Sequence, residues 1–430
     1  MKKAALHNLG CKVNAYETEA MQQMLEAAGY EIVPFNEPAD VYVVNTCSVT
    51  NMADRKSRQM LHKAKKNNPD SIVVATGCYV QTSEQEALED LSIDIVIGNN
   101  RKHELVSLIE EFAKDNVLDI NHEKQEFEEL FVSQTAEHTR AFIKVQDGCN
   151  QFCSYCIIPY ARGRVRSRKL ENVIDEVMRL ASNGYKEVVL TGIHLSSYGV
   201  DFEDKTDLLA LIQAVNRVDG IERIRLGSLE PKIVTEEFAS ALSQMPKVCP
   251  HFHLSLQSGC DATLKRMNRR YTAEEYETGC RLLRKYFKHP AITTDVIVGF
   301  PGESDEEFEI TKQFLKKIHF YEMHIFKYSK RKGTRAAVMQ DQVAEHIKTG
   351  RSAELISLGN EMSDEFRMYY TGKIKDVLFE EKVEINGKSY YTGYTKEYVK
   401  VAKESEETLE NQIIEGKITG RLTDDIYIMR

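Results

Sequence analysis

The sequence predicts an α/β protein made of three successive parts: an N-terminal open parallel α/β sheet, a central partial (β/α)6 barrel and a small C-terminal antiparallel β-barrel. Two observations predict this class. Short apolar runs alternate with helical patterns in two separate stretches, and the end of the chain alternates apolar and polar residues in the manner of strands. We expect the parts to be residues 1–120, 140–370 and 371–430, with a linker at 121–139.

The strand candidates of the first part are too apolar to have a face in water. They are KAALHNL, EIVPF, DVYVVNT, SIVVATG and IDIVIGN, separated by the helical patterns YETEAMQQMLEAAG, MADRKSRQMLHKAKK and SEQEALEDL. Such alternation predicts a parallel sheet covered by helices on both faces. Residues 121–139 are polar and lack a clear period, which is typical of a linker.

The second part repeats the alternation with six strand candidates: FIKVQDG, EVVLTG, IERIRLGS, HFHLSLQ, AITTDVIVGF and YEMHIFKYS. Six βα units predict an incomplete barrel, open on one side, with its chemistry at the carboxyl ends of the strands. A helical stretch from about 341 to 370 follows. KIKDVLFE, KSYYTGYTKEYVKVA and IIEGKITGRLTDDIYIMR then predict a small barrel, the size of an oligonucleotide-binding module.

Composition narrows the class of protein. No apolar run approaches the roughly eighteen residues that span a bilayer, and the N-terminus is too short in its apolar part for a secretory signal. We therefore expect a cytoplasmic protein with no membrane partner. In that compartment the nine cysteines predict metal ligation or catalysis rather than disulfides. A net charge of −9 argues against a general nucleic-acid coat, although local basic patches can still bind phosphate.

Three cysteines lie close together directly after the strand candidate FIKVQDG. Cys149, Cys153 and Cys156, here called the barrel trio, are spaced C-x3-C-x2-C. Closely spaced thiolates bind zinc or the iron of an iron–sulfur cluster. A structural zinc site needs a fourth ligand, and the closest histidines, His138 and His194, are not near this stretch. A 4Fe–4S cluster on three cysteines leaves one iron open to another ligand. A packed group of free cysteines is the alternative.

This spacing after the first strand of a βα barrel resembles the radical S-adenosylmethionine (SAM) enzymes. The resemblance implies that the barrel trio is catalytic and that its open iron binds the amino and carboxylate groups of SAM. It also implies SAM-binding residues on successive strands. These are Tyr155 near the adenine, Thr191 and Gly192 at the methionine amino group, and Gln257 and Gly299, in HLSLQSG and VIVGFPGE, at the ribose and adenine.

A second set of cysteines, here called the N-terminal trio, comprises Cys11, Cys47 and Cys78, each immediately after a predicted strand. Because the carboxyl ends of parallel strands form one crevice, the three thiols could converge on one site. Any one of them is more often a small buried residue, but three at the same topological position are hard to assign to packing. The remaining cysteines, interpreted as structural, are Cys249, Cys260 and Cys280.

The whole chain resembles the methylthiotransferases. The motifs are LGCKVNAYETE, VVNTCSVT, ATGCYVQ, GCNQFCSYCIIPYARGRVRSR, HLSLQSG, TTDVIVGFPGE and YSKRKGTRAA, before a TRAM-like barrel. The resemblance implies a 4Fe–4S cluster on each trio. The first reductively cleaves SAM to methionine and a 5′-deoxyadenosyl radical, and the second carries the sulfur, methylated by another SAM, that is inserted into a C–H bond. It also implies an electron donor such as flavodoxin or ferredoxin and a sulfur donor. The HNLG before Cys11 departs from the usual aromatic-Thr-Leu-Gly, but changes no ligand.

Three subfamilies share this layout. Two modify adenosine 37 in the tRNA anticodon loop, bearing an isopentenyl or a threonylcarbamoyl group, and the third modifies a ribosomal-protein aspartate. GCKVNAYETE resembles the threonylcarbamoyl subgroup, which implies 2-methylthio-N6-threonylcarbamoyladenosine as the product. This choice of subgroup rests on the resemblance alone, because Lys12 and Val13 of the motif need not contact the substrate. A non-enzymatic iron–sulfur protein is the alternative from another class. It would need the cysteines, but not TGIH, HLSLQSG or VIVGFPGE.

Basic residues follow three of the predicted barrel strands, where phosphate contacts would position an RNA loop. The patches are Arg162, Arg164, Arg166, Arg168 and Lys169; Lys265, Arg266, Arg269 and Arg270; and Lys327, Lys330, Arg331, Lys332 and Arg335. Any one patch taken alone could equally be a solvated face. In the C-terminal barrel, Tyr390, Tyr391, Tyr394 and Tyr398 could stack unpaired bases, although tyrosines in strands more often pack.

Overall fold

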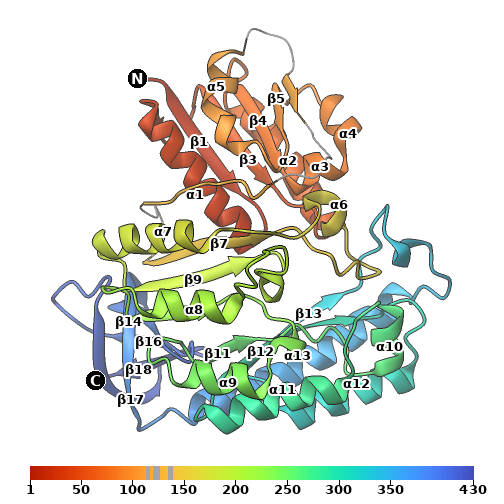
Figure 1. The fold of residues 1–430 in the computed structure, drawn as a ribbon, viewed down its shortest axis with the longest axis vertical. Helices are drawn as coiled ribbons and strands as arrows, with labels where there is room; N and C mark the ends of the chain where they lie inside the picture. Colours follow the sequence, from red (N-terminus) through yellow and green to blue (C-terminus); the bar gives the residue numbers. More distant parts are fainter. Residues whose placement is uncertain (113–116, 120–125, 134–138) are drawn as a thin grey trace.

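The predicted α/β class is confirmed. The structure, a computed structural model, describes residues 1–112, 117–119, 126–133 and 139–430. Figure 1 shows an N-terminal sheet with its helices, an open barrel and a small closed barrel. Parts of the expected linker, 121–125 and 134–138, lie outside the described residues. No helix in the described part of the chain is long and apolar enough to cross a membrane.

The N-terminal sheet has six parallel strands in the order β2-β1-β3-β4-β5-β6. All five predicted strands are present, and β6 was not predicted. Helices α1 and α5 cover one face, and α2 and α3 cover the other. The bounds are β1 (Lys3–Asn8), α1 (Lys12–Ala27), β2 (Glu31–Ile32), β3 (Val41–Thr46), α2 (Asn51–Asn67), β4 (Ile72–Gly77), α3 (Cys78–Thr82), α4 (Glu84–Leu88), β5 (Ile95–Ile97), α5 (Leu105–Glu110) and β6 (Val117–Asp119).

The central part is an incomplete barrel of two sheets, β10-β9-β7-β8 and β11-β12-β13, joined by isolated parallel bridges such as Ile224 with Val248. All six predicted strands are present, and the two-residue antiparallel β8 is additional. The bounds are β7 (Arg140–Asp147), α6 (Ile158–Arg162), β8 (Arg166–Ser167), α7 (Leu170–Ser182), β9 (Glu187–Gly192), α8 (Leu208–Asn216), β10 (Arg223–Leu226), α9 (Glu236–Ser243), β11 (His251–His253), α10 (Asp261–Arg266), α11 (Ala273–Tyr286), β12 (Ala291–Val298), α12 (Asp305–Ile318), β13 (Glu322–Lys327) and α13 (Glu345–Met368).

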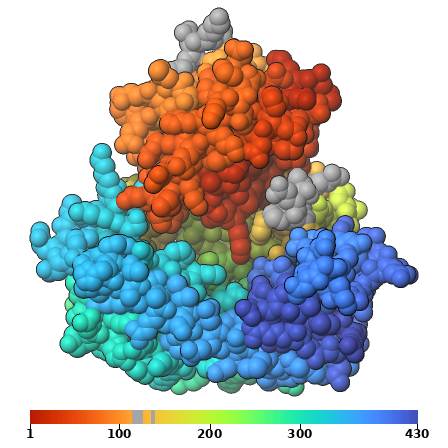
Figure 2. All heavy atoms as spheres, turned by 180° about the vertical axis from the view of Figure 1, so that it is seen from behind, coloured from red at the N-terminus to blue at the C-terminus, as the bar shows by residue number. Residues whose placement is uncertain are grey.

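The two sides of the first barrel strand, β7, pack against different helices. Ala141, Ile143 and Val145 pack outward into the core shared with helix α7. The alternate residues point inward, because successive side chains of a strand face opposite sides, and there Phe142 packs near Tyr16 of α1. Helix α1 of the N-terminal sheet therefore lies against the inner face of the open barrel. Figure 2 shows a hollow between the N-terminal part and the C-terminal half of the chain.

The C-terminal part closes into a barrel in the order β14-β15-β16-β18-β17. Asn386 and Gly387 both have positive φ, at 51° and 75°, which is the geometry that an Asn-Gly hairpin turn requires. Arg223 donates to the carbonyls of Tyr394 and Asp376, each at 2.8 Å, so this barrel docks against the beginnings of the central strands. The bounds are β14 (Ile374–Ile385), β15 (Lys388–Thr395), β16 (Lys400–Lys403), β17 (Ile413–Arg421) and β18 (Ile426–Met429).

Candidate functional site

The barrel trio lies in the loop between β7 and α6, at the carboxyl end of the first barrel strand. The loop folds back on itself, because the Cys149 amide donates to the carbonyl of Gly163 at 3.0 Å. Gly148 has a φ of 69°, and a Cβ there would overlap the Arg164 carbonyl, so glycine is required at this turn. On the other side, the Ser154 amide and hydroxyl donate to the segment that ends α10, at 2.9 and 2.8 Å.

The three thiols of the barrel trio lie close enough together to affect one another's ionisation. Burial, aided by the charge of neighbouring thiols, raises the pKa of Cys149 to about 11 and that of Cys156 to about 12. Arg269 donates to Cys153 Sγ at 3.2 Å, and the Gln151 amide donates to Cys149 Sγ at 3.4 Å. Metal binding removes such thiol protons. Three converging soft donors with nearby N–H groups fit an iron–sulfur cluster.

The structure brings the five expected SAM-binding residues to the same end of the barrel. Tyr155 lies within the cysteine loop, Thr191 and Gly192 end β9, Gln257 follows β11, and Gly299 follows β12. Gln257 and Gly299 both have a φ of 70°, and a Cβ on Gly299 would overlap the side chain of Lys348. This common location is what a ligand spanning several strand ends requires. Their contacts with SAM remain predictions.

Sequence reasoning missed a polar group beside the cysteine loop. Glu230, after β10, accepts from Gln151 Nε2 at 3.1 Å and lies 3.2 Å from His194 Nε2 and 3.6 Å from Arg269. Burial would raise the pKa of Glu230, but the hydrogen bond and charge of His194, together with Arg269, lower it below its ordinary value. The signal in the sequence was the segment GSLEP directly after a strand, at the barrel end where chemistry occurs.

The N-terminal trio also converges. Cys11, Cys47 and Cys78 follow β1, β3 and β4, which are adjacent parallel strands. A Cβ on Gly10 would come within 2.8 Å of Cys47 Sγ, so the loops after β1 and β3 touch. Burial raises the pKa of Cys78 to about 11, and the charges of Cys11 and Cys47 add to the effect. The crevice argument expected this convergence, and three thiols are donors of the kind that binds an iron–sulfur cluster.

A fully buried set of charges connects the two trios. This set, here called the buried charge network, consists of Glu17 on α1, Lys144 and Asp147 on β7, and Arg162 on α6. Arg162 donates to Glu17 at 2.9 Å, to Asp147 at 3.1 Å and to Asn14 at 2.7 Å. Lys144 lies 2.7 Å from Glu17 and 2.6 Å from Asp147. Because α1 begins directly after Cys11, the network fixes the N-terminal trio relative to the barrel.

The carboxylates of the network stay ionised. Burial would raise the pKa of Glu17, but the charges of Arg162, Lys102 and Lys144 lower it well below its ordinary value. A second contact holds the same two parts together: buried Arg331, after β13, pairs with Asp54 and donates to Ser48 at 2.6 Å, beside Cys47. The two sets of contacts therefore hold the loops of Cys11 and Cys47 against the barrel.

These contacts correct the prediction that all three basic patches face RNA. Arg162, Arg168, Arg269 and Arg331 are buried in ion pairs or against the barrel trio, and Arg266 pairs with Glu307. The exposed members are Arg164, Lys169, Lys265, Arg270, Lys327, Lys330, Lys332 and Arg335. Most of the arginines in these patches therefore join parts of the fold. The eight exposed residues, here called the basic rim, are the members of the patches that are open to phosphate.

Of the two alternatives for the tyrosines of the C-terminal barrel, base stacking or packing, the structure shows packing contacts for all four. Tyr390 and Tyr391 are buried in the barrel. Tyr398 stacks on Tyr394, with ring centroids 4.4 Å apart, and on His251 of the central barrel at 4.7 Å. The two stacked tyrosines thus close the lower end of the central barrel, where its strands begin.

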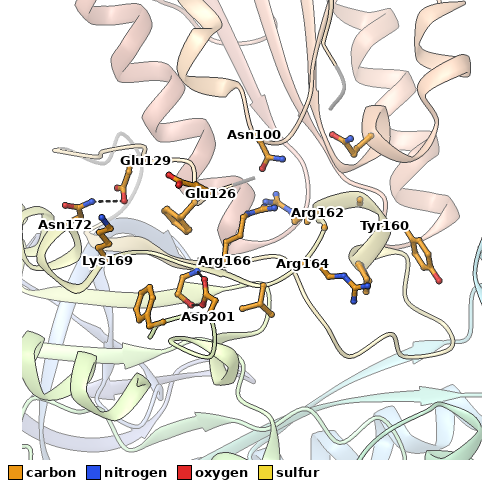
Figure 3. Close-up of a pocket in the computed structure, with 18 of the residues that line it drawn as sticks. Asn100, Glu126, Glu129, Tyr160, Arg162, Arg164, Arg166, Lys169, Asn172 and Asp201 are labelled. Atoms are coloured by element: carbon orange, nitrogen blue, oxygen red, sulfur yellow. Dashed lines mark hydrogen bonds between the residues drawn. The ribbon is translucent and has the colours of Figure 1, made fainter. Parts of the chain in front are cut away.

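A cavity of about 770 Å³ lies beside the segment that follows the barrel trio, and its lining residues are drawn in Figure 3. Arg164, Arg166 and Lys169 line it together with the carboxylates of Glu129 and Asp201. Arg166 is buried and lies 3.6 Å from Asp147. Because both signs of charge share the wall, the cavity does not favour a polyanion.

The inner side of the central barrel carries further charges. Arg140, Glu187, Arg225 and His251 occupy inward positions, since their strand neighbours pack into the outer core. Lys12, the residue after Cys11, keeps access to water yet interacts with this group. Burial by the surrounding protein and the charges of Arg225 and Arg140 lower the pKa of Lys12 to about 8.

The fold and the barrel trio together define a radical SAM enzyme. Residues 143–315 match the radical SAM superfamily, and residues 3–98 match the uncharacterized protein family UPF0004. Among solved structures, the radical S-adenosylmethionine methyltransferase TsrM of Kitasatospora setae is similar in fold. The TM-score is 0.56 at 16% identity, over 79% of this chain and 75% of that chain.

Full-length relatives narrow the class. The threonylcarbamoyladenosine tRNA methylthiotransferase MtaB of Bacillus subtilis is 42% identical, over 97% of this chain and 94% of its own length. The tRNA-2-methylthio-N(6)-dimethylallyladenosine synthase of Pelotomaculum thermopropionicum is 36% identical, over 98% of this chain and 96% of its own length. The chain belongs to the radical SAM methylthiotransferase family, whose radical SAM part implies a 4Fe–4S cluster and SAM.

Proposed function

We propose that this protein is a tRNA methylthiotransferase that converts N6-threonylcarbamoyladenosine at position 37 to its 2-methylthio derivative. The observation that carries the proposal is the pair of cysteine trios, each convergent, held in a fixed relation by the buried charge network. Relatives named for the threonylcarbamoyl substrate reach 42% identity, whereas relatives named for the dimethylallyl substrate reach 38%, which supports the choice between substrates.

The reaction explains why two sites are needed. The hydrogen on adenine C2 is not acidic enough for a protein base of ordinary pKa to remove as a proton. A 4Fe–4S cluster with SAM at the barrel trio supplies one-electron chemistry that can remove it as an atom. The chain's part is to hold SAM through Tyr155, Thr191, Gly192, Gln257 and Gly299 at one barrel end, and to keep water from the radical.

We assign a second 4Fe–4S cluster to the N-terminal trio, as the place from which sulfur is delivered. The support is structural: three thiols from adjacent strand ends converge, and α1 carries this site onto the inner side of the open barrel. The remaining needs of the reaction are met from outside the chain: an electron donor such as flavodoxin or ferredoxin would reduce the radical site, a sulfur donor would replace the sulfur atom that each product carries away, and another SAM would supply the methyl group.

The substrate is an anticodon-loop base that must leave its stack to reach the barrel. Proteins usually recognise RNA sequence through unpaired bases in loops. The basic rim around the barrel end offers phosphate contacts that would position such a loop. Isopentenyladenosine 37 is the second candidate, favoured by the 36% identical relative. A ribosomal-protein aspartate is the third candidate, because the subfamily that modifies it resembles this chain in its domain layout.

The test offers the reconstituted enzyme two tRNA pools, one bearing threonylcarbamoyladenosine 37 and the other isopentenyladenosine 37, with SAM and dithionite. Nucleoside mass spectrometry should find the 2-methylthio product in the threonylcarbamoyl pool. Methylthiolation of the isopentenyl pool alone would assign the second substrate. Modification of neither pool, together with a modified ribosomal protein, would assign the third.

A further inference from the structure

Two histidines and an aspartate gather on the inner side of the central barrel. His253, Asp295 and His324 lie on β11, β12 and β13, which are adjacent parallel strands (Figure 1). Leu254 and Val296, the next residues along the chain from the first two, pack into the outer core. Asp295 and His324 are register partners, which share one face of a sheet. All three side chains therefore point into the barrel lumen.

The three side chains bring their donor atoms together. One nitrogen or oxygen atom of each lies within 4.8 Å of those of the other two. His253 Nε2 lies 3.3 Å from Asp295 Oδ2, and two ligand atoms bound to a tetrahedral zinc ion at about 2.0 Å lie about 3.3 Å apart. His324 is exposed, so its ring can turn toward the other two at little cost. One side-chain rotation therefore gives the spacing of metal ligands.

His253 is already oriented as a metal ligand. Its Nδ1 atom forms a hydrogen bond with the hydroxyl of buried Thr293, at 3.0 Å. Its Nε2 atom is buried, yet it makes no hydrogen bond to any residue that the structure describes. Such an unsatisfied buried atom indicates a bound water or ion. Metal-binding histidines use their other ring nitrogen for a hydrogen bond that fixes the ring, and the Thr293 contact is of that kind.

We propose that His253, Asp295 and His324 bind a divalent transition-metal ion, with Zn²⁺ as the ion tested. Two imidazoles and one carboxylate form the ligand set of metal sites that keep a coordination position open. The open position would face the lumen and take water or an oxygen atom of a substrate. The amide of Gln257, an expected SAM-binding residue, donates to the Asp295 carbonyl at 2.8 Å. The site therefore adjoins the SAM end of the barrel and shares no residue with either cysteine trio.

The first experiment measures zinc binding by the anaerobically reconstituted enzyme, in which clusters occupy the cysteines. Equilibrium dialysis against buffered Zn²⁺, followed by metal analysis, should find about one tightly bound zinc per chain. His324→Ala and Asp295→Asn should each weaken binding by at least about 100-fold, because even the loss of a hydrogen-bond partner of a ligand costs about 10- to 100-fold. His346→Ala, an exposed histidine on α13, is the matched control and should bind zinc like the wild type.

Two further measurements distinguish a metal site from a structural cluster of polar side chains. Thr293→Val keeps the branched shape of a buried side chain and removes the hydroxyl that orients His253. It should weaken zinc binding by about 10- to 100-fold. X-ray absorption at the zinc edge of the wild-type enzyme should show nitrogen and oxygen ligands at about 2.0–2.2 Å, whereas zinc on cysteines would show sulfur at about 2.3 Å.

The outcomes decide the proposal. Zinc held by nitrogen and oxygen, and weakened in the Thr293, Asp295 and His324 variants but not in His346→Ala, would support it. No zinc in the wild type, sulfur ligands, or unchanged affinity in the three variants would refute it. Iron content and far-UV circular dichroism show whether each variant is folded, and the wild-type absorption spectrum decides without any variant. None of these readouts depends on methylthio transfer, so the result is separate from the proposed function.

Discussion

Replacing Arg162 with methionine should loosen the N-terminal sheet from the barrel. Arg162 is fully buried and donates to three acceptors, Glu17, Asp147 and Asn14. Methionine keeps much of the volume but removes the guanidinium N–H groups from these three acceptors. Removing one partner of a buried ion pair typically costs about 3–5 kcal/mol. Because Lys144 still contacts both carboxylates, at 2.7 and 2.6 Å, we expect the lower end, about 3 kcal/mol.

The assay is urea denaturation of the apo protein followed by far-UV circular dichroism, with the free energy taken from the first transition. Arg281→Met is the matched control, since Arg281 is exposed on α11 and donates to nearby Thr278, and should change stability by less than about 0.5 kcal/mol. The double variant Arg162→Met with Glu17→Gln should recover part of the stability. A decrease below about 1 kcal/mol, or one equal to the control, would refute the role given to the network.

The same variant should change acid unfolding. The folded-state pKa of Glu17 lies below its ordinary value, so its pairing stabilises the fold above about pH 4 and the stabilisation is lost as the pH falls toward the folded pKa. Arg162 is the leading charge that lowers this pKa. Without it the folded pKa rises, and acid unfolding should begin at a higher pH than in the wild type. An unchanged acid midpoint would contradict this.

Three further predictions concern the clusters and the RNA. Anaerobically reconstituted protein should bind on the order of eight iron atoms, and alanine at the whole barrel trio should leave about half; a wild-type content near four would show a single cluster. Alanine at the whole N-terminal trio should preserve 5′-deoxyadenosine formation under dithionite and abolish methylthio transfer, and full transfer would make that trio merely structural. Glutamine at both Arg270 and Lys332 should reduce the salt slope of tRNA binding by about one for each phosphate that the protein no longer neutralises; an unchanged slope would remove them from the basic rim.

Sequence by itself determined the architecture and the positions of the cysteines. Apolar runs of strand length, alternating with helical patterns, were enough because parallel sheets bury both faces. Each cysteine of the N-terminal trio follows a strand directly, so a topological rule about strand ends placed Cys11, Cys47 and Cys78 together without any distance being known. The barrel trio could be predicted from its spacing in the sequence alone, because its three cysteines lie in one short loop.

Only the tertiary structure decided what the charged and aromatic side chains do. Arg162 pairs with Glu17, 145 positions away, and Arg331 contacts Ser48 across 283 positions. Tyr398 finds its ring partner His251 on another part of the chain. Apolar periodicity is local and repeats along an element, whereas a buried charge takes its partner from whichever distant segment packs against it. The packing of α1 against the open barrel therefore turned arginines expected at an RNA surface into internal ion pairs that join parts of the fold.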